Sequence, residues 1–284
     1  MTVQTLTSAL ALSPIEPGSF SIEIGGDFSN GRISAPPEKG FPFGGLLAAL
    51  IAKAMRDGLG LSAPLRSLSI QYLAAPVYGA TITLTPRLLR GGRTVAYAGL
   101  EVRQGERLTH QAQATWGADD ASGETAELIV APPPLASLDP ERTLSGPLAP
   151  HFSQHVEYRF ETGPNLLQGR SGETAVERLW MRTRDGLPLD MERLCYLMDA
   201  LYPPAWTAAT RPLRMATVDL RYDIVRDPTP ETAPDGWAFF EFRLQDLGRG
   251  WTVDDLTVRG ADGSLIALGR QRRKASPSRA AGEG

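Results

Sequence analysis

The amino-acid sequence predicts an α+β protein made of two tandem halves, in each of which a curved antiparallel sheet wraps around a long helix. Each half contains one strongly apolar stretch of helical character, and four strand-like segments follow that stretch. Short links that contain glycine join several neighbouring segments, as is typical of hairpins between antiparallel strands. The pattern repeats after about 150 residues, which is too long for a solenoid and indicates a duplicated domain.

The first half is organised around the apolar stretch Leu46–Met55, in which Lys53 is the one charged residue. A helix that is apolar nearly all round is usually buried. Gly44 and Gly45 precede it, so another segment or a ligand can approach its first backbone amides, which lack partners within the helix. The alternative is tight packing of the helix start. The strands expected in this half are Ser19–Ile24, Arg32–Ser34, Arg66–Pro76, Ala80–Arg90, Arg93–Gln104 and Arg107–Gly117.

The second half is organised around Leu189–Pro204, which is predicted to be a helix capped by Asp190 and stopped by Pro203–Pro204. Its middle has apolar residues spaced i, i+3, i+4, i+7, as on one face of a helix. Asp199 is the one charged residue there, so it either reaches a pocket or is a partly exposed carboxylate in the last turn. The strands expected in this half are His151–Phe160, Glu173–Arg184, Arg214–Arg226, Trp237–Asp246, Trp251–Arg259 and Leu265–Arg273.

These segments give the domain boundaries. Residues 1–120 form the first domain and residues 151–275 the second. Residues 121–150, rich in Asp, Gly, Ser and Pro, are expected to be a linker, and residues 276–284 a disordered tail.

The composition argues against several classes of protein. With 284 residues, 42% apolar and 21% charged, the chain is an ordinary globular protein. A net charge of −3 argues against nucleic acid or an anionic membrane as the main partner. The single cysteine, Cys195, rules out an internal disulfide, and the three histidines lack the spacing of metal ligands. We recognise no signal peptide and no apolar run of the about eighteen residues that span a membrane, so we expect a cytoplasmic protein.

Several motifs occur in a characteristic order and spacing. FPFGG precedes the first helix, PLRSLSIQYLAAP and LRGGRTVAYAGLEVRQ follow it, and the second half contains MDALYPPAW, ATVDLRYDIVRDP and DGSLIALGRQ. Over about residues 20–274 the chain thereby resembles the double-hotdog acyl-CoA thioesterases, the thioesterase II-like family. The resemblance implies two tandem hotdog domains and hydrolysis of a hydrophobic acyl-CoA, with no metal or organic cofactor. The alternatives are a non-catalytic binder of an acyl thioester or other hydrophobic small molecule, and an esterase-like enzyme of the same fold.

The resemblance also implies the site. The family uses an Asp on the second helix, a Thr or Ser at the start of the next strand and a Gln in the last strand, which fall here on Asp199, Thr217 and Gln271. Asp199 would accept a proton from water that Thr217 and Gln271 hold by hydrogen bonds. Amides at Gly44 and Gly45 would supply the oxyanion donors from the other half. The alternative for each residue taken singly is that Thr217 suits a strand by its β-branched shape alone, and that Gln271 is a polar residue at a strand end.

Further residues are assigned more weakly. We expect Phe41, Phe43, Leu46 and Leu47 to line an acyl pocket, and Arg270, Arg272 and Arg273 to be candidates for the CoA phosphates. Asp219 is close enough to Thr217 in sequence to be an alternative base. Aligning the halves places Ala48, Arg66 and Ala114 or a neighbour opposite Asp199, Thr217 and Gln271, so one site per chain is expected. Exposed sheet edges are usually covered, which predicts a homodimer or a larger assembly.

Overall fold

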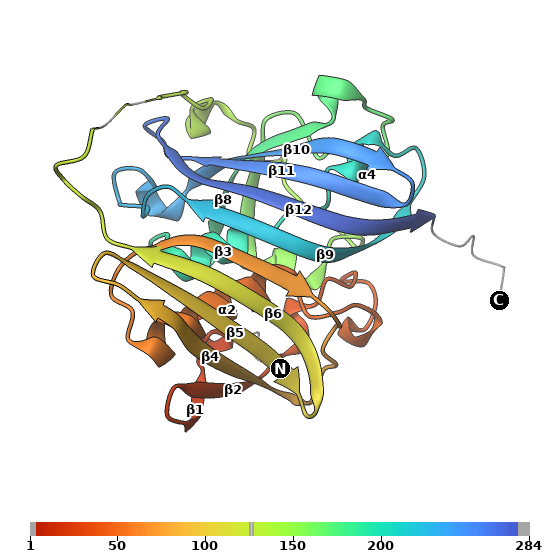
Figure 1. The fold of residues 1–284 in the computed structure, drawn as a ribbon. Helices are drawn as coiled ribbons and strands as arrows, with labels where there is room; N and C mark the ends of the chain where they lie inside the picture. Colours follow the sequence, from red (N-terminus) through yellow and green to blue (C-terminus); the bar gives the residue numbers. More distant parts are fainter. Residues whose placement is uncertain (1–3, 125, 127, 278–284) are drawn as a thin grey trace.

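The computed structural model describes residues 4–124, 126 and 128–277 and contains one twelve-stranded sheet whose neighbouring strands are antiparallel (Figure 1). The first half comprises α1 (Leu6–Ala9), β1 (Ser13–Glu16), β2 (Ser19–Glu23), α2 (Gly44–Leu59), β3 (Leu65–Tyr72), β4 (Thr81–Gly91), β5 (Val95–Gln104) and β6 (Arg107–Gly117). The second half comprises β7 (Val156–Phe160), β8 (Val176–Thr183), α3 (Met191–Leu197), α4 (Ala205–Ala208), β9 (Leu213–Ile224), β10 (Ala238–Gly248), β11 (Trp251–Arg259) and β12 (Leu265–Pro277). Short 3-10 helices lie in the connections, at Gly26–Phe28, Pro37–Lys39, Leu135–Ser137, His151–His155, Gly172–Thr174 and Pro234–Gly236.

The order of strands across the sheet reveals the duplication. It runs β1-β2-β4-β5-β6-β3-β9-β12-β11-β10-β8-β7, so the two halves mirror each other about the β3–β9 pair. At this junction Ile70 lies opposite Leu220, and Leu68 lies opposite Tyr222. The predicted fold of two tandem hotdog halves with a continuous sheet is therefore confirmed.

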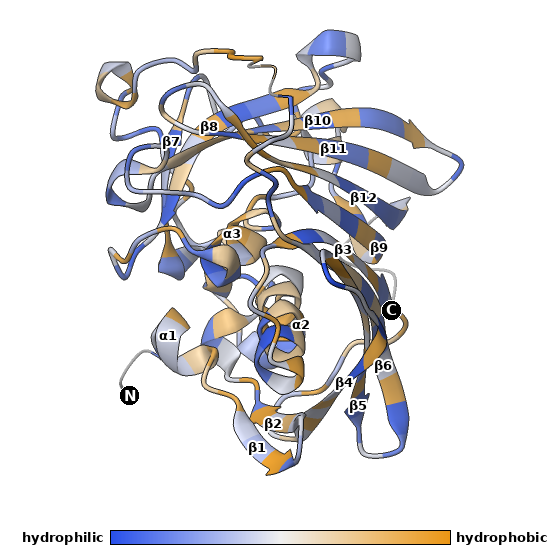
Figure 2. Cartoon of the chain, turned by 60° about the vertical axis from the view of Figure 1, so that its left-hand side comes forward, coloured by the Kyte–Doolittle hydropathy of each residue, from blue (hydrophilic) through white to orange (hydrophobic). Residues whose placement is uncertain are grey.

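Helices α2 and α3 pack against each other inside the curved sheet, on what we call its inner face (Figure 2). Most of α2 is fully buried because its sequence is apolar on nearly every side. Arg56 near the end of α2 pairs with Glu192 at the start of α3, at 2.6 Å. The two helix ends are thus linked by charge as well as by apolar contact.

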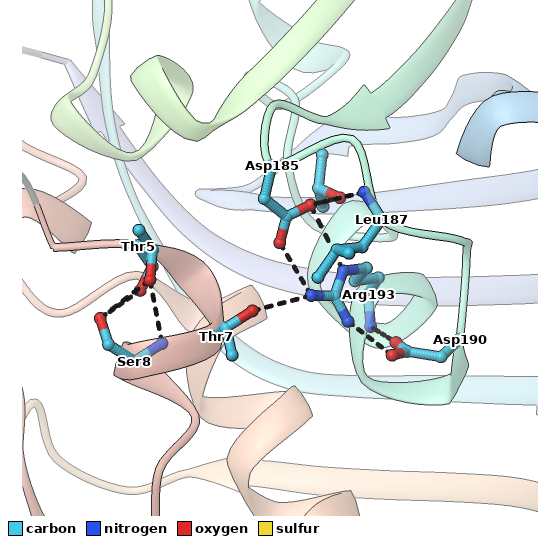
Figure 3. A network of polar contacts seen from close by, with 8 residues as sticks. Thr5, Thr7, Ser8, Asp185, Leu187, Asp190 and Arg193 are labelled. Carbon is cyan, nitrogen blue, oxygen red and sulfur yellow. Dashed lines mark hydrogen bonds and ion pairs between the residues drawn. The ribbon is translucent and has the colours of Figure 1, made fainter.

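The start of α3 is also tied to the amino-terminal helix α1 through the buried side chain of Arg193 (Figure 3). Its guanidinium pairs with Asp185 at 2.8 Å and with Asp190 at 2.5 Å, and it donates to the Thr7 hydroxyl at 3.0 Å. Asp190 accepts a hydrogen bond from the Arg193 backbone N–H, so the predicted N-cap is confirmed.

Some element boundaries differ from the sequence-based expectation. The segment expected as a strand at Arg32–Ser34 makes only an isolated bridge between Arg32 and Pro150, because prolines in the facing segment cannot donate to a ladder. The start of the expected strand His151–Phe160 is a 3-10 helix. Strand β12 continues to Pro277, so Ser276 and Pro277 belong to the sheet, whereas the rest of the expected tail, residues 278–284, lies outside the described residues.

The second helix is shorter than expected. It ends at Leu197 instead of continuing to the two prolines. The backbone tightens there, since the N–H groups of Asp199 and Ala200 bond to carbonyls three residues back, and the Tyr158 hydroxyl donates to the Ala200 carbonyl at 2.9 Å. Asp199 consequently lies in a turn just beyond α3. None of the helices in the described ranges is long and apolar enough to cross a membrane.

Candidate active site

The Asp199 carboxylate lies where the two halves of the chain meet. Its side chain is 11% exposed, and Oδ1 accepts a hydrogen bond of 2.7 Å from Nε2 of Gln271 on β12. The Gly45 backbone N–H, at the start of α2, also bonds to this carboxylate. A Cβ atom at Gly44 would lie 2.7 Å from Oδ2, so only glycine allows this approach. The two glycines before the apolar run thus allow the Asp199 carboxylate to approach the start of α2 closely.

Opposing effects act on the pKa of Asp199. Burial raises it, because removal from water disfavours the charged form, while the positive charge of Arg273 and the hydrogen bonds from Gln271 and Gly45 lower it. The balance leaves the pKa above the ordinary value for aspartate. A carboxylate in such a setting is a stronger proton acceptor than one in water.

A second buried pair lies beside Asp199 and Gln271. Arg273, two residues after Gln271 on the same strand face, has Nη2 3.6 Å from Asp199 Oδ1 and donates to Gln271 Oε1. Its other terminal nitrogen pairs with Asp254 on β11. Arg273 and Asp254 are only 6% and 4% exposed. Four polar side chains therefore form one buried network.

Thr217 shares the inner face with this network but is less closely joined to it. It lies opposite Arg273 in the β9–β12 pairing, where the register shifts at Val218. The side chain is half-buried, and no hydrogen bond links it to Asp199 or Gln271 among the described contacts. Asp219 lies opposite Arg272 on the outer face, away from this network.

A narrow cavity opens next to Gln271 and Arg273, between the segment after α3 and the inner face of the sheet. Its free volume of about 10 Å³ is of the order that one water molecule requires. Arg270, Gln271 and Arg273 of its lining were expected at the site from the sequence, whereas its apolar lining was not. The alternation of side chains along the strands could have identified the lining residues of the sheet. The lining residues after α3 could not be identified without the fold. The apolar and aromatic lining residues are Met198, Leu201, Tyr202, Pro204, Tyr222, Phe242 and Leu256.

The residues expected to line the acyl pocket are not part of this cavity. Phe43, Leu46 and Leu47 are buried in the core, where the Phe43 ring stacks on Phe152 with centroids 3.9 Å apart. Phe41 is 57% exposed. None of these four residues lines the cavity beside Gln271.

The three arginines proposed for the CoA phosphates divide between the two faces. Arg270 and Arg272 are exposed on the outer face, and Arg270 pairs with Asp255 at 2.6 Å. Arg273 alone points inward and is buried beside Asp199. Side-chain alternation along β12 explains the division, because successive residues point to opposite faces of a sheet.

Comparison with known proteins agrees with the architecture and the order of the halves. Residues 34–117 match the family model of the acyl-CoA thioesterase N-terminal domain, and residues 130–272 match that of the acyl-CoA thioesterase C-terminal domain. No curated protein matches the chain in sequence.

Solved structures of similar proteins share the whole fold. A conserved protein of unknown function with a hot dog fold from Alicyclobacillus acidocaldarius has a TM-score of 0.82 and 22% identity, over 96% of this chain and 98% of that one. The acyl-CoA thioesterase II TesB2 from Mycobacterium marinum has a TM-score of 0.72 and 16% identity, over 96% and 99%. The tesB protein of Mycobacterium avium subs paratuberculosis has a TM-score of 0.73 and 14% identity, over 96% and 98%. At these identities the likeness concerns the fold alone.

The fold and the two matched regions define a double-hotdog protein. The chain belongs to the acyl-CoA thioesterase family, because its two halves match the two domains of that family in order.

Proposed function

We propose that this protein hydrolyses acyl-CoA thioesters by direct attack of water, with Asp199 as the general base. The observation that supports this most is the buried Asp199 carboxylate, which is fixed at 2.7 Å by Gln271, a residue that lines a narrow cavity. A buried carboxylate held in this way has both the geometry and the basicity that proton transfer from water needs.

In the proposed reaction, the water oxygen bonds to the thioester carbonyl carbon while Asp199 takes a proton from that water. Gln271 and Thr217 orient that water; both lie on the inner face of the sheet. The C–S bond of the tetrahedral intermediate then breaks, and the proton on Asp199 passes to the departing thiolate sulfur. The products are a carboxylic acid and free CoA, with no change of oxidation state.

The negative charge on the carbonyl oxygen needs hydrogen-bond donors. We place the carbonyl oxygen at the start of α2, where the first amides have no acceptor within the helix and the helix dipole favours negative charge. The Gly45 N–H already bonds to Asp199, which makes the Gly44 N–H the better donor for the oxyanion. Both amides come from the first half, so the reaction would use both halves.

The binding of the two ends of the substrate is also part of the proposal. The acyl group would enter the cavity between the segment after α3 and the sheet, whose lining is mostly apolar. The free volume is of the order of one water molecule, so the lining side chains must move to admit an acyl group. Arg270 and Arg272 remain weaker candidates for the CoA phosphates, since they lie on the outer face.

A free-thiol assay over a panel of acyl-CoA esters of increasing chain length tests the activity. We expect turnover with at least one chain length, and the same panel offered as oxygen esters tests the esterase-like alternative. If no thioester or ester is hydrolysed while acyl-CoA binding is measurable, the protein is a non-catalytic binder and the proposal is wrong.

We also propose a homodimer or larger assembly. The outer strands of the sheet, β1 and β7, leave edges that proteins usually cover, and every residue of β1 is exposed. The mass in solution at micromolar concentration tests this, and a monomeric mass would contradict it.

A further inference from the structure

We infer that Arg273, held by Asp254, is a positioning residue of this site: it fixes the orientation of Gln271 and supplies the positive charge that counters the burial of Asp199. The inference rests on the proposed function only where activity is the readout. The thioesterase proposal itself assigns no role to Arg273 or Asp254.

The first part follows from hydrogen-bond chemistry. A glutamine amide has one accepting and one donating end, and either can face a neighbour. A guanidinium only donates, so the end of Gln271 that faces Arg273 must be the carbonyl oxygen, as observed. The Nε2 group is then directed to Asp199, which it meets at 2.7 Å. Arg273 thus selects the amide orientation in which Gln271 donates to the base.

The second part follows from the groups that surround Asp199. The phenol rings of Tyr72 on β3, Tyr196 on α3 and Tyr222 on β9 interact with its charge, and burial raises the pKa of each above the usual value for tyrosine, so they stay neutral. Helix α2 contributes an uncharged amide. In the described part of the chain, Arg273 is the cation that acts on Asp199, and Asp254 is the further charged group of the network.

Asp254 explains how Arg273 can be held there. An arginine this deeply buried loses its hydration, and one carboxylate at 3.6 Å is a poor replacement. The close pair with Asp254 fixes one end of the guanidinium, and the other end is left for Gln271 and Asp199. The fold itself does not require this pair, because Ala98 and Trp116 occupy the equivalent places in the first half.

Three variants separate charge from orientation. Arg273→Met with Asp254→Asn removes the pair together, which avoids leaving one buried charge unpaired. Arg273→Lys keeps the charge but replaces the planar fork with a single ammonium that cannot reproduce both contacts. Arg193→Met with Asp185→Asn is the matched control, since Arg193 is equally buried between two aspartates but lies at the start of α3, where it contacts α1 (Figure 3).

The readouts are the pKa of Asp199, followed by carboxyl ¹³C NMR and assigned with Asp199→Asn, and the acidic limb of the pH profile of kcat/KM. In the Arg273/Asp254 double variant we expect both to move up by about one pH unit or more, because an opposite charge within 4–6 Å lowers a carboxyl pKa by that order. In Arg273→Lys the limb should stay in place while kcat/KM falls by about tenfold, as for a lost hydrogen bond. The control should lose thermal stability without moving either readout.

Each result bears on the inference. If the Asp199 pKa in the double variant equals that of the wild type, or if the control moves it as much, the inference is wrong. Should the double variant not fold, Asp254→Asn alone decides: a freed guanidinium that still holds Gln271 would leave kcat/KM unchanged and contradict the role of Asp254. Absence of hydrolysis by the wild type contradicts the proposed function but leaves the NMR test of the inference intact.

Discussion

The two halves of this chain have the same strands but very different inner faces. Leu68 lies opposite Ala114 in the first half, as Leu220 lies opposite Gln271 in the second. The next inward pairs are Leu65 with Trp116 and Thr217 with Arg273, and both follow a register shift. Across the neighbouring pair of strands, Ala98 faces Ala114 where Asp254 faces Gln271. The apolar set Leu65, Ala98, Ala114 and Trp116 thus replaces the polar set Thr217, Asp254, Gln271 and Arg273.

The helices differ in the same sense. Helix α2 has 16 residues and is buried from Gly45 to Met55 except at Lys53, whereas α3 has 7 and is followed by the turn that contains Asp199. The long helix lies in the half that has the apolar set, whereas the short helix ends before Asp199 and the cavity. Duplication therefore retained the scaffold twice, but the polar site only once.

The largest effect in this comparison should come from Trp116, which occupies the place of Arg273 and is 1% exposed. Trp116→Ala should destabilise the protein by about 3–5 kcal/mol, the usual cost of deleting a buried aromatic side chain. Activity per folded molecule should change little, because Trp116 belongs to the apolar set. Urea unfolding and kcat/KM under native conditions measure the two effects separately. A hundredfold loss of activity in fully folded protein would show that the first half has a chemical role.

Asp199→Asn should show the reverse pattern. The change keeps the shape of the side chain but removes the base, so hydrolysis should fall by about 10²-fold or more. The melting temperature should stay close to that of the wild type. Asp219→Asn is the control, because that carboxylate lies on the outer face opposite Arg272. If Asp219→Asn abolished activity and Asp199→Asn did not, the base would be assigned wrongly.

The sequence predicts the scaffold well because its signals are local. The apolar run of α2, the alternation in β5 and the glycine links each lie within a few residues, and the structure has these elements close to the expected positions. The meeting of Asp199 and Gln271 is different, since 72 residues separate them, and only the family resemblance predicted it. Composition and periodicity alone contain no information on which distant strands pair.

Two details could not be predicted for physical reasons. The register shift at Val218 makes Leu65, and not Arg66, the counterpart of Thr217, because one bulged residue in each half is left without a partner. Ala114, by contrast, is confirmed as the counterpart of Gln271. The burial of Arg273 depends on which face of β12 its side chain points to and on its pair with Asp254 in β11. That pair can be recognised only when β11 and β12 are known to be neighbours in the sheet.

Smaller effects are expected from the two residues that orient the water. Gln271→Ala and Thr217→Val each remove one hydrogen bond, so each should lower kcat/KM by about tenfold or less. Gln271→Ala should be the larger, because Gln271 touches Asp199 directly and Thr217 does not. Steady-state kinetics at a pH above the acidic limb measures both. If Thr217→Val were as active as the wild type, Thr217 would have no part in the reaction and only a structural role in β9.

The smallest effect concerns His110, which lies opposite Tyr72 in the first half, where Ala267 lies opposite Ile224 in the second. His110 is 1% exposed, its Nδ1 is 3.0 Å from the Thr109 hydroxyl, and burial lowers its pKa to about 4. Below the ordinary pKa of 6.5 the unfolded chain binds a proton that the folded chain does not, so stability falls as pH decreases from 6.5 toward 4. At pH 5.5 this amounts to about 1 kcal/mol.

The change His110→Gln should therefore flatten the decline of stability in this pH window, although it can lower stability at neutral pH by altering the packing. The free energy of unfolding from urea titrations at pH 7.5, 6.5 and 5.5 gives the slope for each protein. His151→Gln is the comparison, because that ring is only half-buried, with Nε2 2.9 Å from the Ala35 carbonyl oxygen. The two halves differ at this position, because the first keeps a buried imidazole neutral where the second has Ala267. If wild type and His110→Gln lose stability in parallel, His110 is protonated in the folded state and this contrast is wrong.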